Sequence, residues 1–314
     1  MSLRIIIPII LSFLAFSPPA LAFEGLVQTF GTSGTIAWGT GDITVLQEVT
    51  VDETGSDQTL SPLAVRKAVS RARKQMLDMV LSTRIDGRQT VSAYLSGDSE
   101  LAVQVRGLIQ NSLFQGPALF GPSGTVRVSE RFRGQLAELV LPMTIQFQSG
   151  IPPRLSTSSA PGMSLSDNAP EEVGSGTRGY TGVVVDARGL KITPALAPII
   201  YGQDGFAAYG PYLVSRTNAV NKGVAVYSVT DNADVLDERA GLRPLMVRAL
   251  SAYGSWRTDM IISSSDARLI RAVAKSGTIA DGCRVVILVD APVVEPGTAV
   301  PAKEPEGNEE NNDA

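Results

Sequence analysis

The sequence predicts an α+β protein of two small modules, in which helices pack on antiparallel or mixed sheets and a flexible linker joins the modules. Apolar residues recur at helical spacing in residues 62–81 and 97–111. Runs rich in β-branched residues, bounded by glycine turns, indicate strands in both halves of the chain. Residues 149–178 are dense in serine, proline and glycine, a composition typical of a linker.

The first residues have the order of a secretory signal peptide. Arg4 is followed by an apolar run over residues 5–16 and then by the small residues Ala20 and Ala22. The run is shorter than the roughly 20 apolar residues that span a bilayer. We therefore expect residues 1–22 to be removed by cleavage after Ala22, which leaves the mature chain periplasmic or associated with the outer membrane. The absence of a cysteine near this point excludes a lipid anchor on a mature N-terminal Cys.

The N-terminal module is predicted over residues 23–148. Its first part, residues 35–51, has strand character broken at Gly39 and Gly41. The pair Ser61-Pro62 then predicts a helix start, with Ser61 as the cap.

That helix is expected to run over residues 62–81 and to bury one apolar stripe of Val65, Val69, Ala72, Met76 and Val80. A second helix is expected to open at Gly97-Asp98-Ser99 and to end near Asn111. Residues 125–128 and 136–147 read as two strands that pair as a hairpin.

The C-terminal module is predicted over residues 179–292 and is followed by a disordered acidic tail, residues 293–314. The length of the chain allows each module a separate core. A hairpin is expected where an Asp-Gly turn at 204–205 separates two apolar segments. A helix is expected after Ser264-Ser265-Asp266. The other predicted strands are 180–186, 224–227, 245–250, 259–262 and 283–290.

Composition excludes several kinds of site. The chain has no histidine, so it has no Ser-His-Asp or Cys-His site, and the commonest ligand for zinc or copper is missing. Its single cysteine, Cys283, cannot close an internal disulfide and is predicted to be a buried apolar residue. With 27 basic against 31 acidic residues, no excess of positive charge favours nucleic acid. We predict no cofactor, no metal and no nucleic-acid partner.

One dense basic face stands out on the helix predicted at 62–81. It consists of Arg66, Lys67, Arg71, Arg73 and Lys74, opposite the apolar stripe. The face is either a solvated surface or a binding site for an anionic lipid, an anionic glycan or an acidic partner.

Three carboxylates sit at predicted strand ends: Asp186, Asp259 and Asp290. If they converge, they form an acid-base pair or hold a divalent cation. Aspartate also initiates ordinary turns at strand ends. A carboxylate-dependent enzyme is therefore an alternative, while the absence of any other catalytic group favours a protein that is not an enzyme.

The N-terminal part resembles a family of outer-membrane-associated proteins that includes the Helicobacter 20-kDa lipoprotein and the flagellar basal-disk and ring proteins FlgP and FlgT. The resemblance rests on the segments SPLAVRKAVSRARKQMLDMV, Thr83-Arg84-Ile85-Asp86 and VSAYL with GDSELAVQVRGLIQ. Stretches of the second half, such as YTGVVVDARGL and CRVVILVD, look like a module found beside such domains in exported bacterial proteins. The lipidated cysteine of the lipoprotein members is missing here.

The resemblance implies α+β modules with scaffold or assembly roles and no catalytic residues. The expected function is that of a non-enzymatic cell-envelope protein in an outer-membrane or flagellar basal-body-associated assembly. Its expected partners are envelope or flagellar proteins, a second copy of the chain, and the outer membrane or cell wall. The alternative is a periplasmic module that binds an anionic glycan or lipid through the basic helix face.

Overall fold

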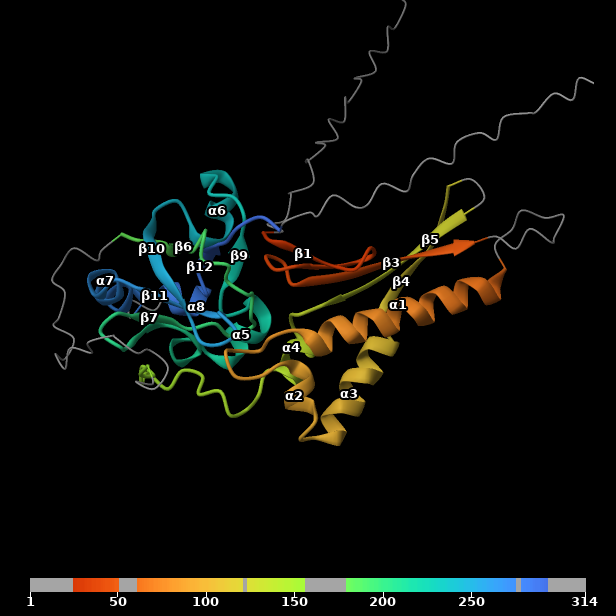
Figure 1. Ribbon diagram of the computed structural model, residues 1–314, viewed down its shortest axis with the longest axis horizontal. Helices are drawn as coiled ribbons and strands as arrows, with labels where there is room; N and C mark the ends of the chain where they lie inside the picture. Colours follow the sequence, from red (N-terminus) through yellow and green to blue (C-terminus); the bar gives the residue numbers. More distant parts are fainter. Residues whose placement is uncertain (1–24, 51–60, 121–122, 156–178, 275–277, 293–314) are drawn as a thin grey trace, which may run out of the picture.

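A computed structural model describes residues 25–50, 61–120, 123–155, 179–274 and 278–292. Within them the chain forms two modules, each with its own sheet and helices (Figure 1). This confirms the predicted α+β class. The expected signal peptide, the acidic tail and residues 156–178 of the expected linker lie outside the described residues. No helix in the described part of the chain is long and apolar enough to cross a membrane.

The N-terminal module contains a five-stranded antiparallel sheet in the order β1-β2-β3-β5-β4. Gly39 and Gly41 lie in the turn between the second and third strands, as predicted, and Gly41 has a φ of 81°. The alternation of apolar residues places Ile43, Val45 and Val49 on the buried face. The strands are β1 (Val27–Phe30), β2 (Gly34–Ala37), β3 (Asp42–Thr50), β4 (Leu113–Phe120) and β5 (Ser123–Arg131).

Helix α1 (Pro62–Ser82) covers one face of this sheet, and no other described element lies over the opposite face (Figure 1). Its predicted stripe packs on the sheet, with Val69, Ala72, Met76 and Val80 buried. Ser61 precedes the helix and Pro62 opens it, as expected. The Ser61 side chain makes no capping hydrogen bond, so the prediction that its oxygen caps the helix is wrong.

Two short helices, α2 (Val91–Leu95) and α4 (Gln135–Val140), and the longer α3 (Ser99–Gln110) complete the module. Helix α3 begins where predicted, because the Asp98 carboxylate accepts hydrogen bonds from the amides of Glu100 and Leu101, both at 3.0 Å.

The hairpin predicted from residues 125–128 and 136–147 is wrong. Strand β5 pairs with β3 and β4, and residues 135–140 form α4 instead. Gly134 turns the chain with a φ of 64°, after which Leu136, Ala137 and Val140 lie on one helical face and are buried. The apolar residues at 136–140 therefore belong to a helix. The helix is too short to show a clear helical period in the sequence.

The C-terminal module contains a seven-stranded mixed sheet in the order β8-β7-β11-β10-β6-β12-β9. The predicted Asp-Gly hairpin is confirmed, since β7 and β8 pair antiparallel. The neighbouring strands β10, β6, β12 and β9 are parallel. Strands β6 and β12 lie inside this group and are buried, which explains their continuous apolar runs. The strands are β6 (Gly182–Asp186), β7 (Ile200–Gly202), β8 (Ala207–Tyr209), β9 (Val226–Ser228), β10 (Pro244–Tyr253), β11 (Asp259–Ile262) and β12 (Val285–Leu288).

Helices surround this sheet. The predicted helix after Ser264 is α7 (Ser264–Ala274), and the Ser263 hydroxyl accepts a hydrogen bond from the Asp266 amide in its first turn. Cys283 is free and buried, as predicted. The remaining elements are α5 (Arg216–Lys222), α6 (Ala233–Ala240), α8 (Thr278–Gly282) and the 3-10 turn η2 (Pro211–Leu213).

The two modules are not separate bodies with separate cores, which corrects that expectation. One buried cluster includes residues of both, and the Trp38 ring meets the Tyr227 ring edge to face at 5.5 Å. Main-chain hydrogen bonds cross between the modules as well. The amide of Leu196 donates to the Arg84 carbonyl at 3.0 Å, and that of Ala197 donates to the Ile85 carbonyl at 2.8 Å.

The start of the segment predicted as a linker also packs against the C-terminal module. The Gly150 amide donates to the Tyr212 carbonyl at 2.9 Å, and the buried Leu155 donates to the Gly205 carbonyl at 2.8 Å. Residues 149–155 therefore extend the second module.

Candidate functional site

The basic face predicted on α1 is present for four of its five members. Arg66, Lys67, Arg71 and Lys74 are exposed, because the opposite side of the helix carries the stripe that packs on the sheet. Within the described ranges no carboxylate lies at ion-pair distance from any of the four. The face therefore keeps its cations free for a ligand, as far as the described residues show.

Arg73 is not part of this exposed face, which corrects the prediction for that residue. Its guanidinium donates to the Ser112 carbonyl at 2.7 Å and lies 5.9 Å from the centre of the Phe114 ring. Its Nε atom is buried and has no partner. Arg73 thus fastens α1 to the start of β4 and has a structural role.

A small cavity of about 230 Å³ lies between the N-terminal half of α1 and the end of β3. Lys67 and Arg71 line it together with Glu48, and the apolar part of its wall includes Val49 and Leu63. Two cations against one carboxylate leave the lining net positive. An acidic group of a lipid or glycan would therefore find both charge and apolar contact here.

The carboxylates at the strand ends are divided between two places. Asp186 is the last residue of β6. Its carboxylate accepts hydrogen bonds from Arg188 at 2.8 and 2.9 Å, and these bonds lower its pKa. Arg188 also donates to Asp231 at 3.1 Å. Asp290 follows β12 and accepts the Gly189 amide at 2.9 Å. These carboxylates hold the loop after β6 in place.

Asp259 lies elsewhere, at the start of β11. Asp259 pairs with Tyr253 of β10, whereas Asp186 pairs with Arg248 of the same strand. The two aspartates are therefore five residues apart along β10. At about 3.3 Å per residue this is roughly 16 Å along the strand. The predicted convergence of Asp259 with Asp186 and Asp290 is wrong, and the described residues contain no cluster of three acidic or cysteine side chains that could hold a metal ion.

Asp259 is nevertheless the most perturbed carboxyl group of the described chain. It is buried, and desolvation raises its pKa to about 7. Its Oδ1 accepts the Ile199 amide at 3.0 Å, a bond that acts in the opposite direction. A carboxyl group with this pKa changes its charge near neutral pH.

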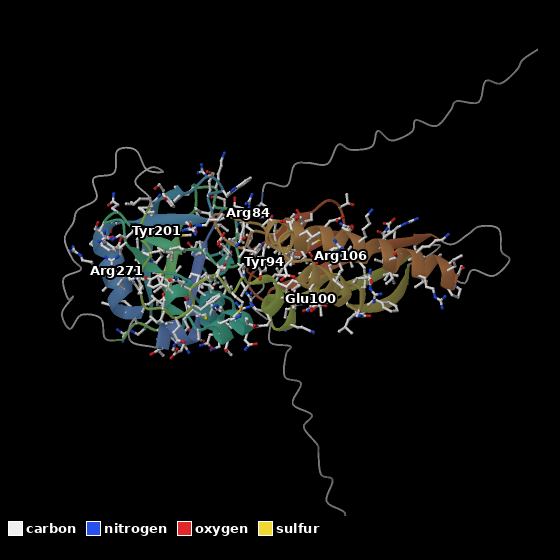
Figure 2. The ribbon with its side chains drawn as sticks, turned by 90° about the horizontal axis from the view of Figure 1, so that it is seen from below. Arg84, Tyr94, Glu100, Arg106, Tyr201 and Arg271 are labelled. Atoms are coloured by element: carbon white, nitrogen blue, oxygen red, sulfur yellow. The ribbon has the colours of Figure 1, made fainter. Side chains whose placement is uncertain are left out.

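The junction between the modules contributes further residues that the sequence did not indicate. Arg84 of the N-terminal module lies over the exposed Trp256 of the second, with its Cζ 3.3 Å from the ring centre, and Figure 2 shows Arg84 at this boundary. Arg133 lies against Gly223, where an added Cβ would be 2.6 Å from the Arg133 Cζ. Burial lowers the pKa of Arg133 to about 10. No local spacing relates these pairs, which are far apart in sequence.

Strand β4 was also missed, although it forms an edge of the first sheet. Leu113 at its start is 78% exposed, and Phe114 is exposed too. The signal available in the sequence was the apolar pair Leu113-Phe114 shortly after a helix end. Gly116 and Pro117 concealed the strand, because they break ordinary strand patterns and here coincide with a shift in register.

Comparisons with known proteins touch only the second module. Residues 182–291 match the family described as Treponema pallidum Tp0624, second domain. The match begins at β6 and ends after β12, so it spans nearly the whole mixed sheet. A comparison with curated proteins finds no match. Neither comparison links the N-terminal module to the outer-membrane-associated family that it resembles, and that resemblance stays a prediction.

Proposed function

We propose that the protein is a non-enzymatic cell-envelope component that binds another protein in an outer-membrane or flagellar basal-body-associated assembly. The observation that carries this proposal is the open edge of the first sheet at β4. Among the described residues this strand pairs on one side only, with β5, and it begins with an exposed leucine and phenylalanine.

An open strand edge offers unpaired amide and carbonyl groups to an extended segment of another chain. The exposed Leu113 would supply an apolar contact beside those hydrogen bonds. The proline and the register shift later in β4 limit such pairing to its first residues, 113–115.

In this proposal, export across the inner membrane brings the open edge of β4 into the cell envelope. The proposal takes the signal peptide at residues 1–22 as cleaved, which would leave the mature chain periplasmic or associated with the outer membrane. The resemblance of the N-terminal module to flagellar and outer-membrane proteins agrees with a scaffold role.

The substitution Leu113→Lys is expected to reduce the recovery of partner protein at least tenfold when the full chain is captured from crosslinked envelopes. A lysine on an edge strand opposes strand addition, because its charge must be desolvated in the new interface. Quantitative mass spectrometry of the captured proteins measures the effect. The matched control is Leu242→Lys, since Leu242 is 83% exposed in the second module. The proposal is contradicted if both variants recover the same amount of partner protein, or if the wild type recovers no partner protein at all.

A second candidate function is binding of an anionic lipid or glycan through the exposed basic face of α1. It is favoured by the four cations that have no described ion-pair partner and by the net positive lining of the adjacent cavity. Each basic residue near an anionic membrane surface contributes about 1 kcal/mol at most. Four together are therefore sufficient for salt-sensitive binding.

Reversal of the four charges is expected to abolish cosedimentation with vesicles that contain an anionic phospholipid. The variant carries glutamate at positions 66, 67, 71 and 74. Wild-type binding should fall steeply as salt rises from low to physiological concentration, because the interaction is screened. The control variant reverses four exposed basic residues of the second module: Lys191, Arg243, Arg248 and Arg268. If both variants lose binding equally, net charge rather than this face is responsible.

A further inference from the structure

The buried carboxyl group of Asp259 lies directly beneath a loop of the other module. An added Cβ on Gly87 would be 3.2 Å from the Asp259 Oδ2 and 3.2 Å from the Thr258 Oγ1. The N-terminal module therefore closes over this carboxyl group through the loop of residues 84–90, and a larger residue at position 87 would press on Asp259 and Thr258.

The same carboxyl group holds the segment to which that loop is hydrogen-bonded. Its Oδ1 accepts the Ile199 amide, and the preceding residues Leu196 and Ala197 donate to the carbonyls of the loop start, Arg84 and Ile85. One side chain thus supports both sides of the main-chain contact between the modules.

The charged groups around Asp259 do not neutralise it. The loop contributes Asp86, which opposes ionisation of Asp259, and the exposed Arg88, whose favourable effect is smaller. Asp86 is fixed by its own loop, since its Oδ1 accepts the amides of Arg88 and Gln89 at 2.8 and 3.0 Å. Strands β7, β10 and β9 contribute the phenol groups of Tyr201, Tyr253 and Tyr227. The segment of residues 195–199 contributes no titratable side chain.

We propose that Asp259 is a proton-operated latch between the two modules: the neutral carboxyl group lets the loop of residues 84–90 close over it, and the ionised carboxylate loosens the loop and the contact with residues 195–199. The ionised form would be a buried charge with Asp86 as its nearest carboxylate neighbour. Opening of the loop admits water to that charge, which makes the open state more favourable when the proton is lost.

The direction of the pH dependence follows from the raised pKa. Asp259 has a pKa of about 7 in the closed state, whereas an exposed aspartate has a pKa of about 3.9. The neutral carboxyl group of Asp259 therefore stabilises the closed state fully below the pKa of the exposed form. This stabilisation is lost as pH rises through the pKa of the closed form, about 7. Between the two values each pH unit increases the opening equilibrium by up to about tenfold, and above about 7 the increase levels off, because Asp259 is then ionised in both states.

Hydrogen exchange of the full mature chain tests the latch. The amides of Leu196 and Ala197 donate across the junction, so their protection factors, corrected for the intrinsic effect of pH on exchange, report its opening. In the wild type they are expected to fall by up to about tenfold between pH 5 and 6 and to change little above pH 8. In Asp259→Asn they are expected to be independent of pH, because asparagine keeps the acceptor for the Ile199 amide and carries no charge.

Two more variants separate this effect from simple destabilisation. Asp290→Asn removes an exposed carboxylate outside the junction and should retain the wild-type pH dependence. Asp86→Asn removes the charge that opposes ionisation of Asp259 and should lower the pKa of Asp259 in the closed state. The loss of protection should then level off at a lower pH and be smaller in total. A wild-type profile without a pH-dependent loss, or an equal loss in Asp259→Asn, overturns the proposal.

Discussion

Replacement of Arg271 by leucine is expected to lower the free energy of unfolding by about 3–5 kcal/mol. Arg271 of α7 is buried and forms an ion pair with Asp204, which lies in the turn between β7 and β8 (Figure 2 shows Arg271 within the second module). It also donates to the Phe206 carbonyl at 3.3 Å. Without the guanidinium, the largely buried Asp204 carboxylate has lost its ion-pair partner. Urea unfolding of the purified protein measures the resulting decrease in the free energy of unfolding.

Two controls identify the unpaired charge as the cause. The double substitution Asp204→Asn with Arg271→Leu should recover part of the loss, because no charge is then left unpaired. Arg268→Leu removes an exposed arginine of the same helix and should change stability by less than about 0.5 kcal/mol. A double variant as unstable as Arg271→Leu would show that packing, not charge, dominates at this position.

The substitution Tyr227→Ala is expected to cost about 3–5 kcal/mol and to weaken the contact between the modules. The ring is fully buried and meets Trp38 of the first module. Its hydroxyl accepts the Ala195 amide at 3.0 Å and donates to the Ala195 carbonyl at 3.2 Å. Because Ala195 also bridges to Arg84, the loss should reach the junction, and hydrogen exchange at Leu196 and Ala197 measures that effect beside urea unfolding.

Tyr227→Phe is the matched variant, since it keeps the ring and removes only the hydroxyl. It leaves the Ala195 amide without an acceptor and should cost about 1–3 kcal/mol. If the two variants are equally unstable, the ring contact with Trp38 contributes nothing measurable, and the expected coupling of the modules through this pair is wrong.

Local patterns in the sequence predicted the elements whose residues carry their own signals. Helix α1 was predicted from the helical spacing of Val69, Ala72, Met76 and Val80. The start of α3 was predicted from Asp98, whose carboxylate caps the helix. The Asp-Gly turn gave the hairpin of β7 and β8. Four of the five basic residues predicted as a binding face are exposed on α1.

Pairings between distant residues could not be predicted in this way. The contacts of Arg73 with Ser112 and of Asp259 with the loop around Gly87 arise only when separate elements meet. Short elements were also misread, because six residues at 135–140 show less than two turns of a helical period. The parallel neighbours of β6 follow from crossover connections, which leave no local trace in the strand itself.

The first described residues of the chain bear on the order in which the native structure can be completed. The Leu26 amide donates to the Tyr227 carbonyl at 2.8 Å, so a residue just before β1 bonds to the edge strand β9, about two hundred positions later in the chain. Because the chain is synthesised from its N-terminus, Leu26 has no partner for this bond until β9 and the strand β12 that pairs with it have been made. Completion of the native state therefore requires the C-terminal module, and a polypeptide that stops early lacks this hydrogen bond.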